Sequence, residues 1–166
     1  AGAYFEGGAP IVEHVTFRDN VPEVGGEWSC PLRMGGGSAN WNAATTYREC
    51  LFTNNQAQLG GGMATWMEDP AAGTPMVLDS TFTANTAEAG SALATYNAAS
   101  TAAPFHVNLL VHGNSSTGWN GQADGSIPTL GAGLSPSFVH CTVADNTGAL
   151  LTGGLQAVES NPIIVN

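Results

Sequence analysis

The sequence predicts an all-β protein coiled as a parallel β-helix of about five to six rungs with loop insertions. An eleven-residue pattern recurs along the chain, and the last residues of neighbouring copies are separated by 35, 30, 29 and 32 positions. Each copy is made of short runs of β-branched and aromatic residues separated by Gly, Asn, Pro and Ser, and no stretch has helical periodicity. Repeats of this length are typical of solenoids and propellers, but a propeller blade needs about 40 residues or more.

The pattern is read most easily in residues 10–20, PIVEHVTFRDN, and a sixth, incomplete copy begins at Pro162. The other complete copies cover residues 45–55, 75–85, 104–114 and 136–146. We call the eleven positions columns, and column eleven is always Asn. Because Asn tolerates the left-handed conformation and its amide can bond to the next rung, we expect a sharp turn and a hydrogen-bonded ladder there. The ladder residues are Asn20, Asn55, Asn85, Asn114 and Asn146.

Columns three, six and eight are mostly apolar, whereas columns four and five carry several charged residues. Three positions separate column three from column six, so a bend must lie between them if both face the core. The core residues expected in columns six and eight are Val15, Phe17, Cys50, Phe52, Phe82, Leu109, Val111, Cys141 and Val143.

The segments between the copies complete the coil. Residues 1–9 and 35–41 are Gly-rich lead-ins, and the same kind of segment returns from Gly60 and from Gly90. Residues 21–34 and 115–129 are the longest insertions. We expect one domain over residues 1–166, either an uncapped part of a longer β-helix or a subunit that stacks end to end, because solenoids normally need caps.

Composition limits the partners. Only 10% of residues are charged, there is no Lys, and the net charge is -10. A nucleic-acid-binding domain needs a basic footprint, and electrostatic attraction to anionic lipid needs the same charge. No apolar run approaches 18 residues. We therefore expect no nucleic acid and no membrane insertion, and an extracellular or cell-surface location.

Three cysteines without CxxC spacing are present. Cys50 and Cys141 share column six and lie three rungs apart, roughly 14 Å at about 4.8 Å per rung, which is too far for a disulfide. Both are expected to be small core residues. Cys30 could reach Cys50 in the next rung, and its pairing is left open.

Five aromatic residues are candidates for contact with a carbohydrate or a protein partner. Trp41, Trp66 and Tyr96 each follow an aligned Gly or Ala by four positions, so their rings should stack in consecutive rungs. If the rings face inward, as we favour, they form a core ladder; if outward, they form a flat platform for sugar rings or a partner. Trp28 and Trp119 lie in the long insertions and are expected to be exposed contact residues.

The strongest candidates for catalysis are Arg48, Glu49 and Asp79. In register, Glu49 and Asp79 should lie about 5 Å apart, where two like charges raise one pKa or attract a cation such as Ca²⁺. The competing interpretation is that Arg48 pairs with Glu13 at the surface. Because neighbouring rungs add few acids or cations, and the histidines have no third metal ligand, we expect no catalytic site, no cofactor and no metal.

The cycle of G-G-x followed by an aromatic residue, then Pro-x-Val, then T-F-x-x-N resembles the right-handed parallel β-helix repeat proteins of bacterial surfaces. These are related in pattern to polymorphic outer-membrane repeats and pectate-lyase-like folds, and the resemblance covers nearly the whole chain. It implies the fold and its right-handed coil. It does not select a function, because such scaffolds serve enzymes, adhesins and structural proteins.

The sequence therefore favours a non-enzymatic structural or adhesive β-solenoid module that could assemble head to tail into a filament. The alternative is a polysaccharide-binding or pectate-lyase-like domain with a glycan partner, because such enzymes use acidic side chains for Ca²⁺ and an Arg as base. The alternative requires a groove that contains Arg48, Glu49 and Asp79 beside outward-facing Trp41 and Trp66.

Overall fold

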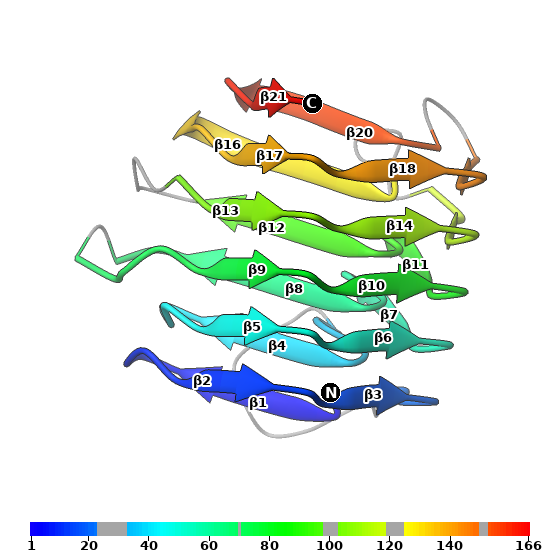
Figure 1. The fold of residues 1–166 in the computed structure, drawn as a ribbon, viewed down its shortest axis with the longest axis horizontal. Coiled ribbons are helices and arrows are strands. Elements are labelled where there is room, and N and C mark those ends of the chain that lie inside the picture. The colour runs from blue at the N-terminus through cyan, green and yellow to red at the C-terminus, as the bar shows by residue number, and fades with distance from the viewer. Residues whose placement is uncertain (23–32, 70, 98–102, 119–124, 150–152) are drawn as a thin grey trace.

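The structure is a computed structural model, and it describes residues 1–22, 33–69, 71–97, 103–118, 125–149 and 153–166. All regular secondary structure in these residues is β-strand. The strands form four sheets in which every pairing is parallel, and successive strands of one sheet come from successive turns of the chain (Figure 1). The all-β class and the parallel β-solenoid are thus confirmed.

The first sheet contains β1 (Ala3–Glu6), β4 (Ser38–Trp41), β8 (Met63–Met67), β12 (Leu93–Asn97), β16 (Ile127–Leu134) and β20 (Leu155–Ser160). The second contains β2 (Ile11–Glu13), β5 (Thr46–Arg48), β9 (Met76–Leu78), β13 (Phe105–Val107), β17 (Ser137–Val139) and β21 (Ile163–Val165). The third contains β3 (Thr16–Arg18), β6 (Leu51–Thr53), β10 (Thr81–Thr83), β14 (Leu110–His112) and β18 (Thr142–Ala144). The fourth contains β7 (Gln56–Leu59), β11 (Thr86–Ala89), β15 (Ser115–Ser116) and β19 (Thr147–Gly148).

Two bends in each rung depend on residues in the left-handed conformation. The first bend joins the second sheet to the third at column five, as the spacing of apolar columns requires. Its residues are His14, Glu49, Asp79, Asn108 and His140, with φ between 50° and 56°. The second bend falls at column ten. Its residues are Asp19, Asn54, Ala84, Gly113 and Asp145, with φ between 53° and 66°. We expected the column-eleven Asn itself to adopt the left-handed conformation. This prediction is wrong by one residue: the column-ten residue adopts that conformation, and the Asn side chain forms the ladder.

Ala84 is the one column-ten residue whose side chain favours neither a turn nor positive φ. It is exposed and has φ of 54°. Because the left-handed conformation costs an L-residue roughly 1–2 kcal/mol and Gly almost nothing, Ala84→Gly is expected to raise the free energy of unfolding by about 0.5–1 kcal/mol. Urea unfolding measures the change. The control is Ala144→Gly in strand β18, which should lower stability by about 0.5–1 kcal/mol; a loss of stability in both variants would contradict the account.

The Asn ladder runs through the whole coil. The Nδ2 atoms of Asn20, Asn55, Asn85 and Asn114 donate to the Oδ1 atom of the next ladder residue at 2.8–3.0 Å. Each Oδ1 also accepts the main-chain N–H of the preceding Asn, at 2.9–3.1 Å. From the second Asn onward, Nδ2 donates in addition to a column-eight carbonyl of the rung before it. The ladder thus ties adjacent rungs together at a position where the three central side chains are buried.

The core lies between the sheets and is organised in ranks of like residues. Phe17, Phe52 and Phe82 stack at centroid distances of 4.8 and 4.5 Å. Tyr47 packs edge-on against this rank, and its hydroxyl contacts Ser38 Oγ at 2.6 Å and donates to Asn40 Oδ1 at 2.9 Å. Burial raises the pKa of Tyr47 to about 12. The hydroxyl therefore serves as a neutral hydrogen-bonding group inside the coil.

Most of the expected core residues are buried, but two are not. Phe17, Cys50, Phe52, Phe82, Leu109 and Val111 are buried, and Cys141 is half-buried. Val15 and Val143 are 37% and 39% exposed, so their assignment to the buried core is wrong. Both lie in end turns of the described coil, where one neighbouring rung is missing. Their side chains occupy inward columns but are covered from one side only.

Cys50 and Cys141 carry free thiols, and each donates to two carbonyls of the second sheet, one in its own rung and one in the rung before it. Burial raises the pKa of both thiols, which keeps them protonated. Cys30 lies outside the described residues. Within the described residues there is no helix long and apolar enough to cross a membrane.

Candidate functional site

The candidate acid and base residues lie on the outer surface around the first bend. Arg48 ends β5 and Glu13 ends β2, so they are neighbours in register, and Arg48 Nη1 donates to Glu13 Oε1 at 2.8 Å. Both side chains are nearly half exposed. A pair of this kind contributes little to stability. The guanidinium is engaged by Glu13, as the competing interpretation of the sequence expected.

Glu49 and Asp79 are directed to different partners. Glu49 Oε2 lies 3.3 Å from Nδ1 of His14, in the rung before it. Asp79 Oδ1 accepts a hydrogen bond of 2.8 Å from Nδ2 of Asn108, in the rung after it. Both acids are exposed bend residues, and their partners lie in rungs on opposite sides of the pair. The structure therefore does not bring Arg48, Glu49 and Asp79 together as a constellation that could hold a substrate.

The described residues contain no group of three or more His, Cys, Asp and Glu side chains that could hold a metal ion. The rank of column-five residues is a line of single polar groups one strand spacing apart, and Ca²⁺ needs six to eight oxygen ligands around one point. The geometry gives no support to a Ca²⁺ site there.

His106 is buried in column three of β13, where its ring stacks on Phe138 at 4.8 Å. Neither ring nitrogen has a hydrogen-bond partner. Burial lowers the pKa of His106 from 6.5 to about 3, so the folded protein holds it neutral. It is a core side chain and not a catalytic base.

His106→Phe is expected to remove an acid sensitivity. Between pH 6.5 and about 3 the unfolded chain binds a proton at this residue that the folded protein does not, so folded stability falls as pH drops through this window. The loss at pH 5 is about 2 kcal/mol. Urea unfolding should show that the free energy of unfolding of the variant, relative to that of wild type, is more favourable at pH 5 than at pH 7. The exposed His112→Gln is the control, and an equal pH dependence of wild type and His106→Phe would refute this role.

The aromatic rank Trp41, Trp66 and Tyr96 lies on the outside of the coil. In β4, Ser38 and Asn40 face inward because both contact the buried Tyr47 hydroxyl. Strand alternation then turns Trp41 outward, and the register carries Trp66 and Tyr96 to the same face. The core position that we favoured from sequence is therefore wrong. The three side chains are half-buried, and Trp66 and Tyr96 pack on a second buried hydrophobic cluster, separate from the core around Tyr47, that includes Ala64 and Ala94.

The geometry of this rank does not make a platform for sugar rings. Trp41 and Trp66 are parallel within 3° at 5.7 Å, and Trp66 and Tyr96 within 2° at 5.0 Å. Stacked rings cover each other's faces and present their edges to solvent, whereas sugar packing needs exposed faces. The Trp66 indole Nε1 also donates to Glu68 at 2.9 Å. Trp28 and Trp119 lie outside the described residues.

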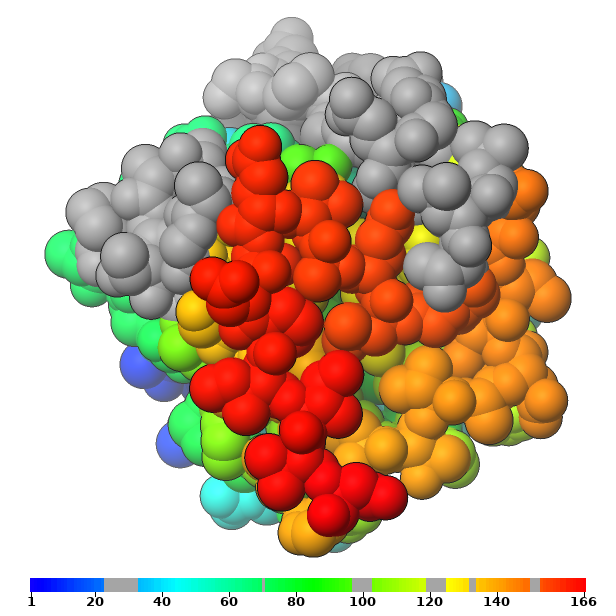
Figure 2. Space-filling view, turned by 90° about the horizontal axis from the view of Figure 1, so that it is seen from above, coloured from blue at the N-terminus to red at the C-terminus, as the bar shows by residue number. Residues whose placement is uncertain are grey.

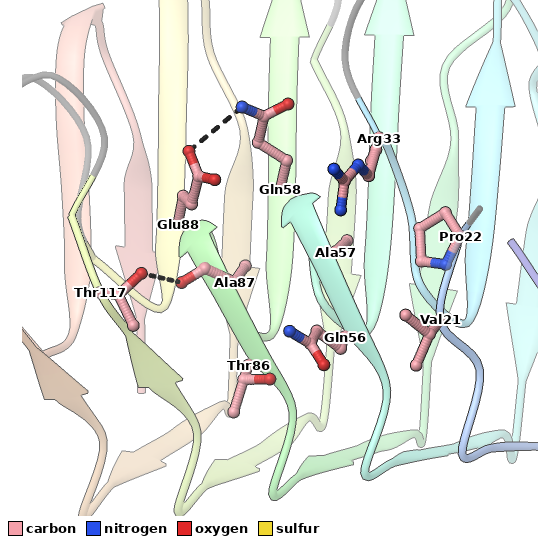
Figure 3. A pocket seen from close by; sticks show the side chains of 10 residues that line it. All are labelled: Val21, Pro22, Arg33, Gln56, Ala57, Gln58, Thr86, Ala87, Glu88 and Thr117. Atoms are coloured by element: carbon pink, nitrogen blue, oxygen red, sulfur yellow. Dashed lines mark hydrogen bonds between the residues drawn. The ribbon is translucent and has the colours of Figure 1, made fainter. Parts of the chain in front are cut away.

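A groove of about 220 Å³ lies on the outer face of β7 and β11, and sequence reasoning did not find it (Figure 3). Ala57 and Ala87 line it together with polar side chains. Gln58 Nε2 donates to Glu88 Oε2 at 3.1 Å across the two strands. The remaining lining residues are Val21, Pro22, Arg33, Gln56, Thr86 and Thr117. The groove has one carboxylate, already hydrogen-bonded, and contains none of the candidate catalytic residues. The signal in the sequence that could have pointed to this groove was the polar type of its lining residues at outward positions.

No protein-family model matches the chain, and comparisons with curated proteins and with solved structures found no significant match. The resemblance to bacterial surface repeat proteins therefore rests on the repeat pattern and on the shared solenoid architecture.

Proposed function

We propose that this chain is a non-enzymatic structural or adhesive β-solenoid module of an extracellular or cell-surface protein, of the kind found in bacterial surface repeat proteins. The observation that carries the proposal is the use of its repeated polar residues. The column-eleven Asn side chains bond to one another through the coil, and the column-four and column-five groups pair along the surface. Side chains that repeat and pair in this way build length; they do not converge on a reacting group.

We infer that the two end turns of the described coil can pair with further β-strands. Val15 at one end, and Val143 and Ile164 at the other, occupy inward columns and are exposed. Figure 2 looks onto the second end, where β20 and β21 form the outermost layer. Open strand edges with exposed apolar residues favour pairing with further strands, and solenoids normally cap them.

At the β21 end of the coil the sheets stop at different rungs, which bears on how another copy could stack there. The first and second sheets end at β20 and β21, but the third sheet ends at β18, which belongs to the rung before β21. A second copy placed with its β2 on β21 would leave one strand position vacant above β18. Direct head-to-tail stacking of identical copies would therefore leave a gap in the third sheet unless another strand filled it.

The alternative, a polysaccharide-binding or polysaccharide-cleaving domain, has the polar groove in its favour. It is opposed by the engagement of Arg48, Glu49 and Asp79 with different partners, Glu13, His14 and Asn108, and by the edge-on aromatic rank. Incubation with a panel of neutral and acidic polysaccharides, with and without Ca²⁺, tests the proposal by product analysis and by binding. We expect neither cleavage nor binding. Cleavage that is lost in Arg48→Ala would overturn the proposal.

A further inference from the structure

The outer face of the second sheet is apolar over four consecutive strands. In β9, β13 and β17 the middle residues Val77, His106 and Phe138 are buried, so the residues on either side of them point outward. The same register places Ile163 and Val165 of β21 on this face. The apolar outward residues are Met76, Leu78, Phe105, Val107, Val139, Ile163 and Val165, and Ser137 is the single polar one.

This face is open to solvent. Phe105, Ile163 and Val165 are 38%, 54% and 47% exposed. In Figure 1 the second sheet lies toward the viewer, and no other described element lies in front of it. Exposed apolar residues are common singly, but a contiguous apolar patch on one face usually marks an interaction surface.

The rest of the surface shows why this face differs. The outward positions of the third sheet mix Thr, Leu, Arg, His and Ala, and the chain carries a net charge of -10. From β9 to β21 the outward positions of the second sheet contain no charged residue. Two copies of so acidic a chain repel each other least where carboxylates are missing. At the other end of the same face, the charged outward residues of β2 and β5 are Glu13 and Arg48, which pair at 2.8 Å, and the exposed carboxylates of Glu49 and Asp79 lie in the bend that borders the face.

We propose that a second copy of this chain packs against the outer face of β9, β13, β17 and β21, sheet against sheet, with the two coils parallel. A two-fold axis along the coil places each strand level opposite the same level of the partner. At the levels from β9 to β21 apolar residues then meet apolar residues, and at the β2 and β5 levels each Glu13 carboxylate stays paired with Arg48 of its own chain. Antiparallel coils centred on the same four strands would leave β2 and β5 outside the contact and so would bury fewer strands. Aligned sheets pack about 10 Å apart in this manner.

The inference rests on the proposed structural function and names its lateral partner. Side-by-side association leaves the end turns free, so a solenoid can be long and paired at once. The area that one chain offers is a narrow strip four strands tall, smaller than the roughly 800 Å² per partner of a standard stable interface. The dimer of this chain is therefore expected to be weak and concentration-dependent, and to tighten as more turns are added.

Sedimentation equilibrium over a wide concentration range tests the proposal. Wild type is expected to show a reversible monomer–dimer equilibrium, and Phe105→Ser with Val107→Ser to weaken it at least about tenfold, the effect of about 1.4 kcal/mol. Val158→Ser is the matched control, because Val158 is equally exposed, at 37%, but belongs to the first sheet. Circular dichroism and urea unfolding verify that each variant is folded.

A second experiment tests the parallel orientation of the two coils. Thr46 faces outward at the β5 level, so Thr46→Cys should give a disulfide-linked dimer in the parallel arrangement, compared with wild type oxidised in the same way. A monomer at every concentration, a dimer unaffected by the Phe105 and Val107 substitutions, or a dimer that Val158→Ser disrupts would overturn the proposal. None of these outcomes bears on the polysaccharide assay, so this proposal and the structural function fail separately.

Discussion

Replacing Asn85 by Ala is expected to lower the free energy of unfolding by about 4 kcal/mol. Asn85 Oδ1 accepts from Asn55 Nδ2 and from the Asn55 main-chain N–H, both at 3.0 Å, and its Nδ2 donates to Phe52 O and Asn114 Oδ1, both at 2.9 Å. The substitution removes one hydrogen bond from each of these four groups in a buried site, although Asn55 Nδ2 still donates to Phe17 O and Asn114 Oδ1 still accepts from the Asn85 main-chain N–H. Each such group costs about 1–3 kcal/mol, reduced where the rungs relax or water enters.

Urea unfolding of Asn85→Ala measures this loss, with Asn54→Ala as the control. Asn54 is the exposed residue beside the ladder, has φ of 53° and donates one exposed hydrogen bond to Asp19 Oδ1, so its replacement should cost only about 1 kcal/mol. Similar losses in the two variants would show that the ladder does not hold the rungs together.

Gly60→Ala is expected to destabilise the protein by about 3 kcal/mol. Gly60 forms the corner between β7 and β8 with φ of 67°, and a Cβ atom there would lie 2.2 Å from Met63 O and 2.7 Å from Ala64 Cβ. The left-handed conformation contributes roughly 1–2 kcal/mol and the clash with the main chain roughly 1–3 kcal/mol.

Gly7 separates these two contributions. Its φ is 65°, but a Cβ atom there would have no neighbour within 4 Å. Gly7→Ala should therefore lose only the conformational part, about 1 kcal/mol. If Gly60→Ala unfolds at the same urea concentration as Gly7→Ala, the corner tolerates a side chain and the packing argument is wrong.

The repeat made the architecture predictable from the sequence. Aligned copies identify the columns, and a parallel solenoid places each column in register, so the ladder partners of Asn85 and the stacking of Phe52 on Phe82 follow from the alignment. The bend before column six follows from spacing alone. The pairing of Glu13 with Arg48 was one of two alternatives, because adjacency in a column does not show which side chain each charge will select.

Other features depend on information that one column does not contain. The facing of Trp41 follows from the contacts of Ser38 and Asn40 with Tyr47, which belongs to a different sheet. The exposure of Val15 and Val143 follows from their places in end turns and not from residue type. The change of column four from Glu13 and Arg48 to aliphatic residues in later rungs was visible in the sequence. That this change creates an apolar outer face could be recognised only once the structure showed that column-four side chains point outward.

The central claim is that this coil is a module built for length, whose end turns accept further β-strands. It is tested most directly by extending the chain after Asn166 with a copy of residues 80–97, which carry the strands β10, β11 and β12. The copy begins at column six, so it would place a Phe over Val143 and an Asn over Asn146. Thermal unfolding should show a higher Tm for the extended protein than for a version with the same residues scrambled. Equal Tm values for the two proteins would contradict the claim.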